Sequence, residues 1–102
     1  MTTALYVTFT VKDPSKMGSL HEFAKKLNQV DGFLQKTWLH QPEQGKGGGF
    51  YLFASKDQAI AYLESDLFKT LETTYCVEDI QTQFWDCSNM RPLSKMTNSQ
   101  IP

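Results

Sequence analysis

Apolar residues recur along the chain with two periods, and their order predicts a small α+β domain. Residues 4–11 and 77–85 alternate side chains with a period of two, which is typical of strands. Residues 13–31 and 55–71 repeat apolar side chains at helical spacing. Residues 32–53 contain two apolar runs with turn residues between them, which predicts a hairpin. The turn residues are Pro42, Gly45, Gly47, Gly48 and Gly49.

Local signals predict where the helices begin and end. Asp13-Pro14 is typical of a helix N-terminus, and Asp31-Gly32 of a stop. Ser55 and Gln58 have the spacing of a capping box at the start of the second helix. Ser65-Asp66 predicts a break or kink within that helix. The apolar stripe expected to pack the first helix on the sheet is Met17, Leu20, Phe23, Ala24, Leu27 and Val30.

The resulting order is β-α-β-β-α-β, which is the ferredoxin-like arrangement of four antiparallel strands with both helices on one face. Residues 50–53 are apolar on both faces of their strand, so we expect cover on each side of the sheet. A chain of 102 residues is too short to cover both faces of the sheet by itself. We therefore expect a homodimer, in which a second copy of the chain covers the other face. We divide the chain into a domain over residues 1–88 and a polar, proline-containing arm over 89–102 that contacts the partner subunit.

Composition narrows the classes of partner and site. A net charge of −1 gives no electrostatic basis for binding nucleic acid, and no apolar run reaches the ~20 residues of a membrane span. The N-terminus lacks a basic region before its apolar stretch, so we expect a cytoplasmic protein. Cys76 and Cys87 have no metal-ligand spacing, which predicts no metal site. At either end of one strand they lie roughly 36 Å apart, too far for a disulfide, and we expect buried, reduced thiols.

The first arm of the hairpin carries the best candidates for a ligand site. Lys36, Trp38 and His40 alternate along one strand and are expected to share a face with Leu34. A tryptophan can form the wall of an aromatic site, while an ammonium stabilises a phenolate or an oxygen-derived anion. The alternative is that Trp38 belongs to the core and Lys36 to the surface. We place His40 and Tyr51 with Trp38 as substrate-binding candidates, although packing also explains Tyr51.

His21 and Asn28 are the candidates on the first helix. They lie seven positions apart, so they share a helix face, and both are expected to point into a cleft between helix and sheet. A neutral histidine there can take a proton from a substrate hydroxyl, and an amide can hold the resulting oxyanion with Lys36. The alternative is a solvated flank for His21 and a helix-end hydrogen bond for Asn28.

The sequence contains a set of short motifs: Asn28-Gln29, Gly32-Phe33-Leu34, Lys36, Trp38, Gly48-Gly49, Tyr51-Leu52-Phe53, Ala59, Ala61-Tyr62-Leu63-Glu64 and Pro92-Leu93-Ser94. Together, at these spacings, they resemble the motifs of the YdhR-type monooxygenases. The resemblance implies a dimeric α/β barrel, in which two ferredoxin-like sheets pack face to face. It also implies a relationship to the antibiotic-biosynthesis monooxygenases, which oxygenate aromatic substrates without metal or flavin. The expected function is therefore a cofactor-independent monooxygenase that acts on a phenol or quinol.

Two other functions fit parts of the pattern. A homodimer with an aromatic-lined interior binds apolar small molecules whether or not it is an enzyme. The RNA-recognition fold has the same element order, and residues 46–53 resemble its third-strand motif. However, Gly48 replaces the first stacking aromatic of that motif, and the acidic balance disfavours phosphate binding. We therefore expect a small aromatic substrate as partner and no nucleic acid.

Overall fold

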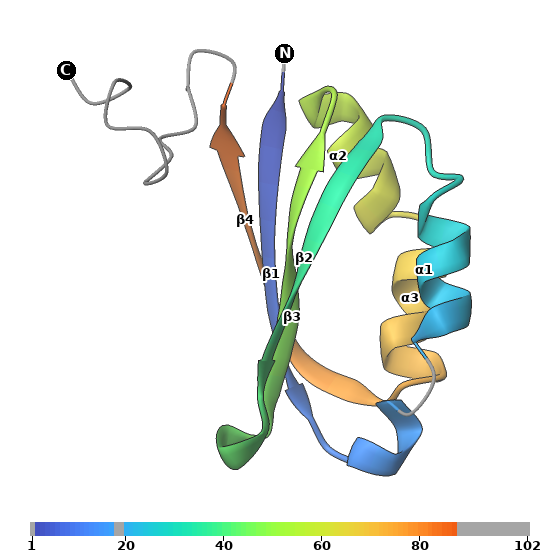
Figure 1. Ribbon diagram of the computed structural model, residues 1–102, viewed down its shortest axis with the longest axis vertical. Helices are drawn as coiled ribbons and strands as arrows, with labels where there is room; N and C mark the ends of the chain where they lie inside the picture. The colour runs from blue at the N-terminus through green and yellow to red at the C-terminus, as the bar shows by residue number, and fades with distance from the viewer. Residues whose placement is uncertain (1, 18–19, 88–102) are drawn as a thin grey trace, which may run out of the picture.

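A four-stranded antiparallel sheet with helices on one face forms the framework of the protein (Figure 1). The structure, a computed structural model, describes residues 2–17 and 20–87, so the predicted arm over 89–102 lies outside the described residues. The strand order β2-β3-β1-β4 is that of a ferredoxin-like sheet, which confirms the predicted fold class. The elements are β1 (Thr3–Val11), α1 (His21–Leu27), β2 (Phe33–Gln41), β3 (Lys46–Phe53), α2 (Lys56–Leu63), α3 (Asp66–Thr73) and β4 (Val77–Asp86), with 3-10 turns η1 (Pro14–Met17) and η2 (Pro42–Gln44).

Strands β2 and β3 form the predicted hairpin, closed by η2 and by Gly45 at φ +63°. A β-bulge interrupts the pairing near the start of β2, because Phe33 pairs with Phe53 but Gln35 pairs with Leu52. The extra residue, Leu34, is exposed, while the Phe33 ring packs 6.0 Å from that of Phe53. A bulge shifts the alternation of side chains by one residue. The prediction that Leu34 shares a face with Lys36 is therefore wrong, and Phe33 takes that place.

The first helix is shorter than predicted, whereas the break in the second is confirmed. The Asp13 carboxylate accepts hydrogen bonds from the Ser15 N–H (3.1 Å) and hydroxyl (2.6 Å), which close only the short turn η1. Helix α1 begins later, at His21. Ser55 caps α2 by accepting a bond from the Gln58 N–H (3.2 Å), and Ser65 caps α3 in the same way. No helix within residues 2–17 and 20–87 is long and apolar enough to cross a membrane.

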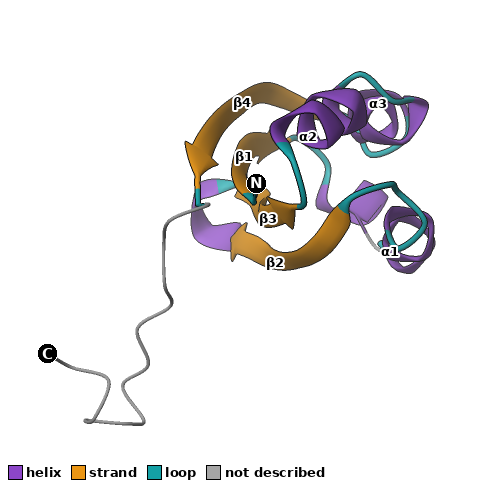
Figure 2. Ribbon diagram, turned by 90° about the horizontal axis from the view of Figure 1, so that it is seen from above, coloured by secondary structure: helices purple, strands orange, loops and turns teal. Residues whose placement is uncertain are grey.

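The core lies between the sheet and the helices α1, α2 and α3, which cover the same face (Figure 2). At its centre the hydroxyls of Tyr51 on β3 and Tyr62 on α2 are hydrogen-bonded to each other at 2.7 Å. Burial raises the pKa of both tyrosines above the ordinary value of 10, so both are neutral near pH 7. The largest fully buried side chains are Tyr51, Tyr62, Phe23, Phe53, Leu5, Leu71 and Val7.

The opposite face of the sheet, which we call the open face, carries apolar side chains that no described element covers. Tyr6 pairs with Phe50 across β1 and β3, and their rings lie 6.5 Å apart. Tyr6, Phe50 and Trp85 keep 41%, 38% and 55% of their area exposed. The prediction that residues 50–53 are apolar on both faces of their strand is thus confirmed, because Phe50 lies on the open face while Tyr51 and Phe53 are buried.

Cys76 and Cys87 flank β4, as predicted, and both thiols are free. Each residue is partly exposed, because it lies just beyond an end of the strand where the packing of the sheet stops. The prediction that both are buried is therefore wrong.

Candidate functional site

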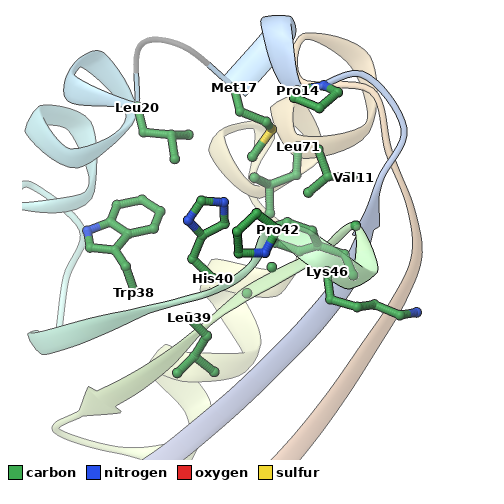
Figure 3. A pocket seen from close by; sticks show the side chains of 14 residues that line it. Val11, Pro14, Met17, Leu20, Trp38, Leu39, His40, Pro42, Lys46 and Leu71 are labelled. Carbon is green, nitrogen blue, oxygen red and sulfur yellow. The ribbon is translucent and has the colours of Figure 1, made fainter.

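A cavity of about 470 Å³ opens between the sheet and the helical layer, at the end of the molecule where η1 and the hairpin turn meet. Its walls come from β1, η1, β2, η2, β3 and α3, so residues distant in sequence converge on it (Figure 3). A volume of this size suits a small organic ligand. The main apolar lining residues are Phe9, Val11, Met17, Leu20, Trp38 and Leu71.

Gly47 on β3 allows a neighbouring ring to pack closely at this end of the sheet. Gly47 lies beside Phe9 of β1 and opposite His40 of β2, and a Cβ added to it would come within 2.9 Å of the Phe9 ring. Without a side chain at Gly47, the Phe9 ring lies directly against β3. Gly47 therefore allows the Phe9 ring to line the cavity close to the backbone of β3.

One imidazole faces the apolar lining. His40 lies among Trp38, Leu20 and Pro42 in the close view of the cavity (Figure 3). Lys46 also touches the lining, but its side chain points away from the cavity and its ammonium donates to the Thr10 hydroxyl at 3.0 Å. Of the lining residues, His40 is thus the titratable one placed to exchange a proton with a bound ligand.

Lys36 lies next to this wall inside a cage of aromatic rings. Its Nζ atom is 3.3 Å from the centroid of the Trp38 ring, 4.5 Å from that of Tyr51 and 5.0 Å from that of Phe23. In the described part of the chain it makes no hydrogen bond or ion pair. Burial lowers the pKa of Lys36 from its ordinary 10.5 to about 7, while the negative faces of the rings favour the ammonium. Lys36 thus changes charge in the neutral range.

The cage depends on a missing side chain at Gly49. This residue pairs with Trp38 on β2, and its Cα lies beneath the Lys36 side chain. A Cβ there would come within 2.5 Å of Lys36 Cε and 3.0 Å of the Tyr51 ring. Glycine at this position therefore allows the lysine to fold back over the sheet against the rings.

The structure brings together four of the six predicted site residues. Lys36, Trp38 and His40 follow one another along the helix-facing side of β2, and Tyr51 pairs with Lys36 from β3. Trp38 and His40 line the cavity, whereas Lys36 and Tyr51 lie behind Trp38. Their roles in binding or catalysis stay predictions.

His21 and Asn28 lie elsewhere, and the expectation that they point into the cleft is wrong. Both are exposed, one at the first residue of α1 and the other at its C-cap, and neither lines the cavity. The reason is helix geometry, because the buried residues of α1 are Phe23 and Leu27. Positions two and six residues from His21 lie on the opposite side of a helix of 3.6 residues per turn.

Sequence reasoning missed Phe23 as a member of the cage and Gly49 as its floor. The usable signal was the pairing of the hairpin arms, which sets Gly49 opposite Trp38 and Tyr51 opposite Lys36. Cross-strand partners on one face are in contact, so the register of the hairpin predicts most of the cage. Phe23 comes from a separate element and required the packing of α1 on the sheet.

The family model described as "Putative mono-oxygenase ydhR" matches residues 4–100 of the sequence. The chain belongs to the YdhR family. This match extends over both the described domain and most of the C-terminal residues, and it confirms the resemblance in the sequence motifs. No curated protein matches this YdhR family member.

Solved structures share the fold of this YdhR family member at low sequence identity. SnoaB, a cofactor-independent oxygenase from Streptomyces nogalater, superposes with a TM-score of 0.70 at 16% identity, covering 90% of this chain and 98% of that one. A protein described as "Putative antibiotic biosynthesis monooxygenase" from Nitrosomonas europaea superposes with a TM-score of 0.66 at 12% identity, covering 89% of this chain and 94% of that one. A similarly named protein from Deinococcus radiodurans gives 0.65 at 13%, with 92% and 99% covered. These similarities establish the fold alone.

Proposed function

We propose that the protein is a cofactor-independent monooxygenase whose substrate is an electron-rich aromatic of the phenol or quinol type. The observation that carries this proposal is the apolar cavity with a single inward-facing imidazole in its lining. Membership of the YdhR family and the shared fold with SnoaB support it. A flat aromatic ring suits walls made of Trp38, Leu20 and Met17.

In the proposed reaction the substrate supplies all the electrons. A phenol and O₂ give a quinone and water: one oxygen atom becomes the new carbonyl, and the other leaves as water with the two hydrogens that the substrate loses. The phenolate gives up electrons to oxygen more readily than the neutral phenol does. The tasks of the protein are therefore to remove the hydroxyl proton and to stabilise the anion that remains.

We assign these tasks to residues of β2 because of their positions at the cavity. His40 accepts the phenol proton, because its ring lies within the lining. Trp38 forms the wall against which the substrate ring lies, and Lys36 supplies positive charge from behind it. We leave His21 and Asn28 without a role, since they lie on the exposed side of α1.

Oxygen uptake tests this function. We expect a metal-free, flavin-free preparation to consume oxygen with members of a panel of phenols, hydroquinones and dihydroxynaphthalenes. The chain has two histidines, and single variants therefore decide between them. His40→Gln should lower the rate about 10²-fold to 10⁴-fold, as expected for a lost base. A larger loss in His21→Gln than in His40→Gln would return the catalytic role to α1.

A non-catalytic small-molecule-binding protein is the second candidate, and the almost wholly apolar lining favours it. Both functions predict that the aromatic panel binds and that Trp38→Ala weakens binding. They differ in turnover. Binding without oxygen uptake across the whole panel would replace the enzyme with the binding protein.

We also propose that the protein is a homodimer assembled through the open face of the sheet. The supporting observation is the exposed apolar set Tyr6, Phe50 and Trp85, which spans three neighbouring strands. An apolar patch of this kind is typical of an interface between subunits. A second copy of the same sheet is apolar in the same places and buries this surface in a self-complementary way.

Sedimentation velocity tests the dimer. We expect a dimer at micromolar concentration and a total buried area above ~2,000 Å². Phe50→Lys places a charge on the open face and should weaken association at least ~10-fold. Ile60→Lys is the matched control, because Ile60 is exposed to a similar extent on α2. A wild-type protein that sediments as a folded monomer would contradict the proposal.

A further inference from the structure

The wall of the cavity at Trp38 has a charge behind it. The Lys36 ammonium lies over one face of the indole, 3.3 Å from the ring centroid, and Trp38 also lines the cavity. A bound ligand therefore meets the part of the ring that Lys36 does not cover. The indole separates the cation from the cavity without screening it, because an aromatic ring has a low dielectric response.

We propose that Lys36 is a specificity-determining residue that makes the cavity select aromatic ligands bearing a negative charge. It acts through Trp38, since it does not itself line the cavity. This inference rests on the proposed function, in which the cavity is the ligand site. It deepens that function by stating which ionic form of the ligand is held most tightly.

The preference follows from the arrangement of charges. A cation on one face of an aromatic ring withdraws electron density from the other face, which then attracts an electron-rich ring. The ammonium also acts on a ligand anion through apolar surroundings with little water to screen it. In the described part of the chain no carboxylate pairs with Lys36, so its field is not cancelled locally. A neutral ligand of the same shape gains neither attraction.

Other titratable groups near the cage must be separated from Lys36. Tyr51 on β3 faces it directly and Tyr62 on α2 lies behind Tyr51, but burial raises the pKa of both, and they stay neutral. Phe23 on α1 carries no charge. His40 and Lys46 also touch the lining, and each has a nitrogen that can interact with an anion. The test therefore removes each of these in turn.

Calorimetric titration with a matched pair of ligands tests the proposal. 2-Naphthoate and 2-naphthamide have almost the same shape, and the first is an anion throughout the range from pH 6 to pH 8.5. For the wild type at pH 6 we expect the naphthoate to bind roughly ten-fold more tightly than the amide. Since Lys36 loses its proton near pH 7, this preference should fall as the pH rises.

Variants assign the preference to one residue. Lys36→Met should bring the two affinities together by weakening the naphthoate alone, and Lys36→Arg should keep the preference at pH 8.5 because arginine stays charged. His40→Gln and Lys46→Gln should each retain most of the difference at pH 6. In the His40→Gln background the remaining pH dependence reports on Lys36.

The outcomes distinguish this inference from the proposed function. Equal binding of the two ligands by the wild type overturns the inference and leaves the cavity as an aromatic site. A preference that survives in Lys36→Met, or disappears in His40→Gln, overturns it as well. If neither ligand binds, the cavity is not an aromatic site, and the proposed function fails with it.

Discussion

The layer between sheet and helices has two ends that are packed in opposite ways. At the closed end, below α2, the rings of Tyr51, Phe53, Tyr62 and Phe68 fill the space and leave almost nothing exposed. At the hollow end, below η1, the cavity opens. Along β3 the closed end has aromatic residues on its helix-facing side, and the hollow end has glycines.

The comparison shows how one strand serves stability at one end and binding at the other. Gly47 and Gly49 are followed by Tyr51 and Phe53 on the same face of β3, so this face changes from glycines to aromatic side chains along residues 47–53. Lys36 and Trp38 lie across from the change. The aromatic cage thus marks the border between the end that holds the fold together and the end that is available to a ligand.

The largest expected effect is a difference in the free energy of unfolding between substitutions at the closed end and at the hollow end. Phe53 is fully buried at the closed end, while Trp38 is 42% exposed at the hollow end. We expect Phe53→Ala to lower the free energy of unfolding by about 3–5 kcal/mol, and Trp38→Ala to lower it by about 1 kcal/mol. Urea unfolding of both variants measures the difference. Similar losses would show that the two ends are equally important to the fold.

A second prediction concerns the polar pair inside the closed end. Tyr62→Phe removes one of two hydroxyls and leaves the Tyr51 hydroxyl buried without its partner. We expect a loss of about 1–3 kcal/mol in the free energy of unfolding, part of which returns when Tyr51→Phe is added. A double variant less stable than the single one would contradict this.

The same tyrosines predict a dependence on alkaline pH. Their pKa values are raised in the folded state, so above about pH 10 the unfolded chain ionises first and wild-type stability falls. The Tyr51→Phe/Tyr62→Phe variant should fall less over the same range. Unfolding curves at several pH values check the sign.

The smallest effect on stability is expected at the aromatic cage, where the Lys36 ammonium lies among aromatic rings. The pKa of Lys36 is lowered on folding, so burial of its ammonium costs stability below pH 7, and this cost disappears between about pH 7 and the ordinary 10.5. We expect Lys36→Met to raise the free energy of unfolding by about 1 kcal/mol at pH 6, because attraction to the rings offsets part of the cost. The gain should shrink at pH 9. A destabilised variant at pH 6 would show that the rings outweigh burial.

Local chemistry explains the parts of the fold that the sequence predicts well. The Ser55 and Ser65 caps, the turn at Gly45 and the alternation in β1 each depend on a few neighbouring residues. The predicted start of the first helix is wrong because it also depended on local residues alone. Asp13-Pro14 provides the same local signal for one 3-10 turn as for a long helix, and only tertiary packing decides between them.

The residues of the candidate site also differ in whether local sequence or tertiary packing determines their positions. Lys36, Trp38 and His40 follow from the period of one strand, although the bulge at Leu34 was not visible in it. His21 and Asn28 required the rotation of α1 about its own axis, which Phe23 and Leu27 determine by packing on the sheet. The cavity is lined by residues of six elements, and no single stretch of the sequence therefore predicts it.

The bulge in β2 has a consequence for how the chain tolerates changes in length. It lies between α1 and the cage, while the register of Lys36, Trp38 and His40 is fixed from the other side by the hairpin turn. A residue gained or lost near Leu34 is therefore absorbed where the strand is already irregular. The connection from α1 can be lengthened or shortened in engineered chains without turning the binding residues to the other face of the sheet.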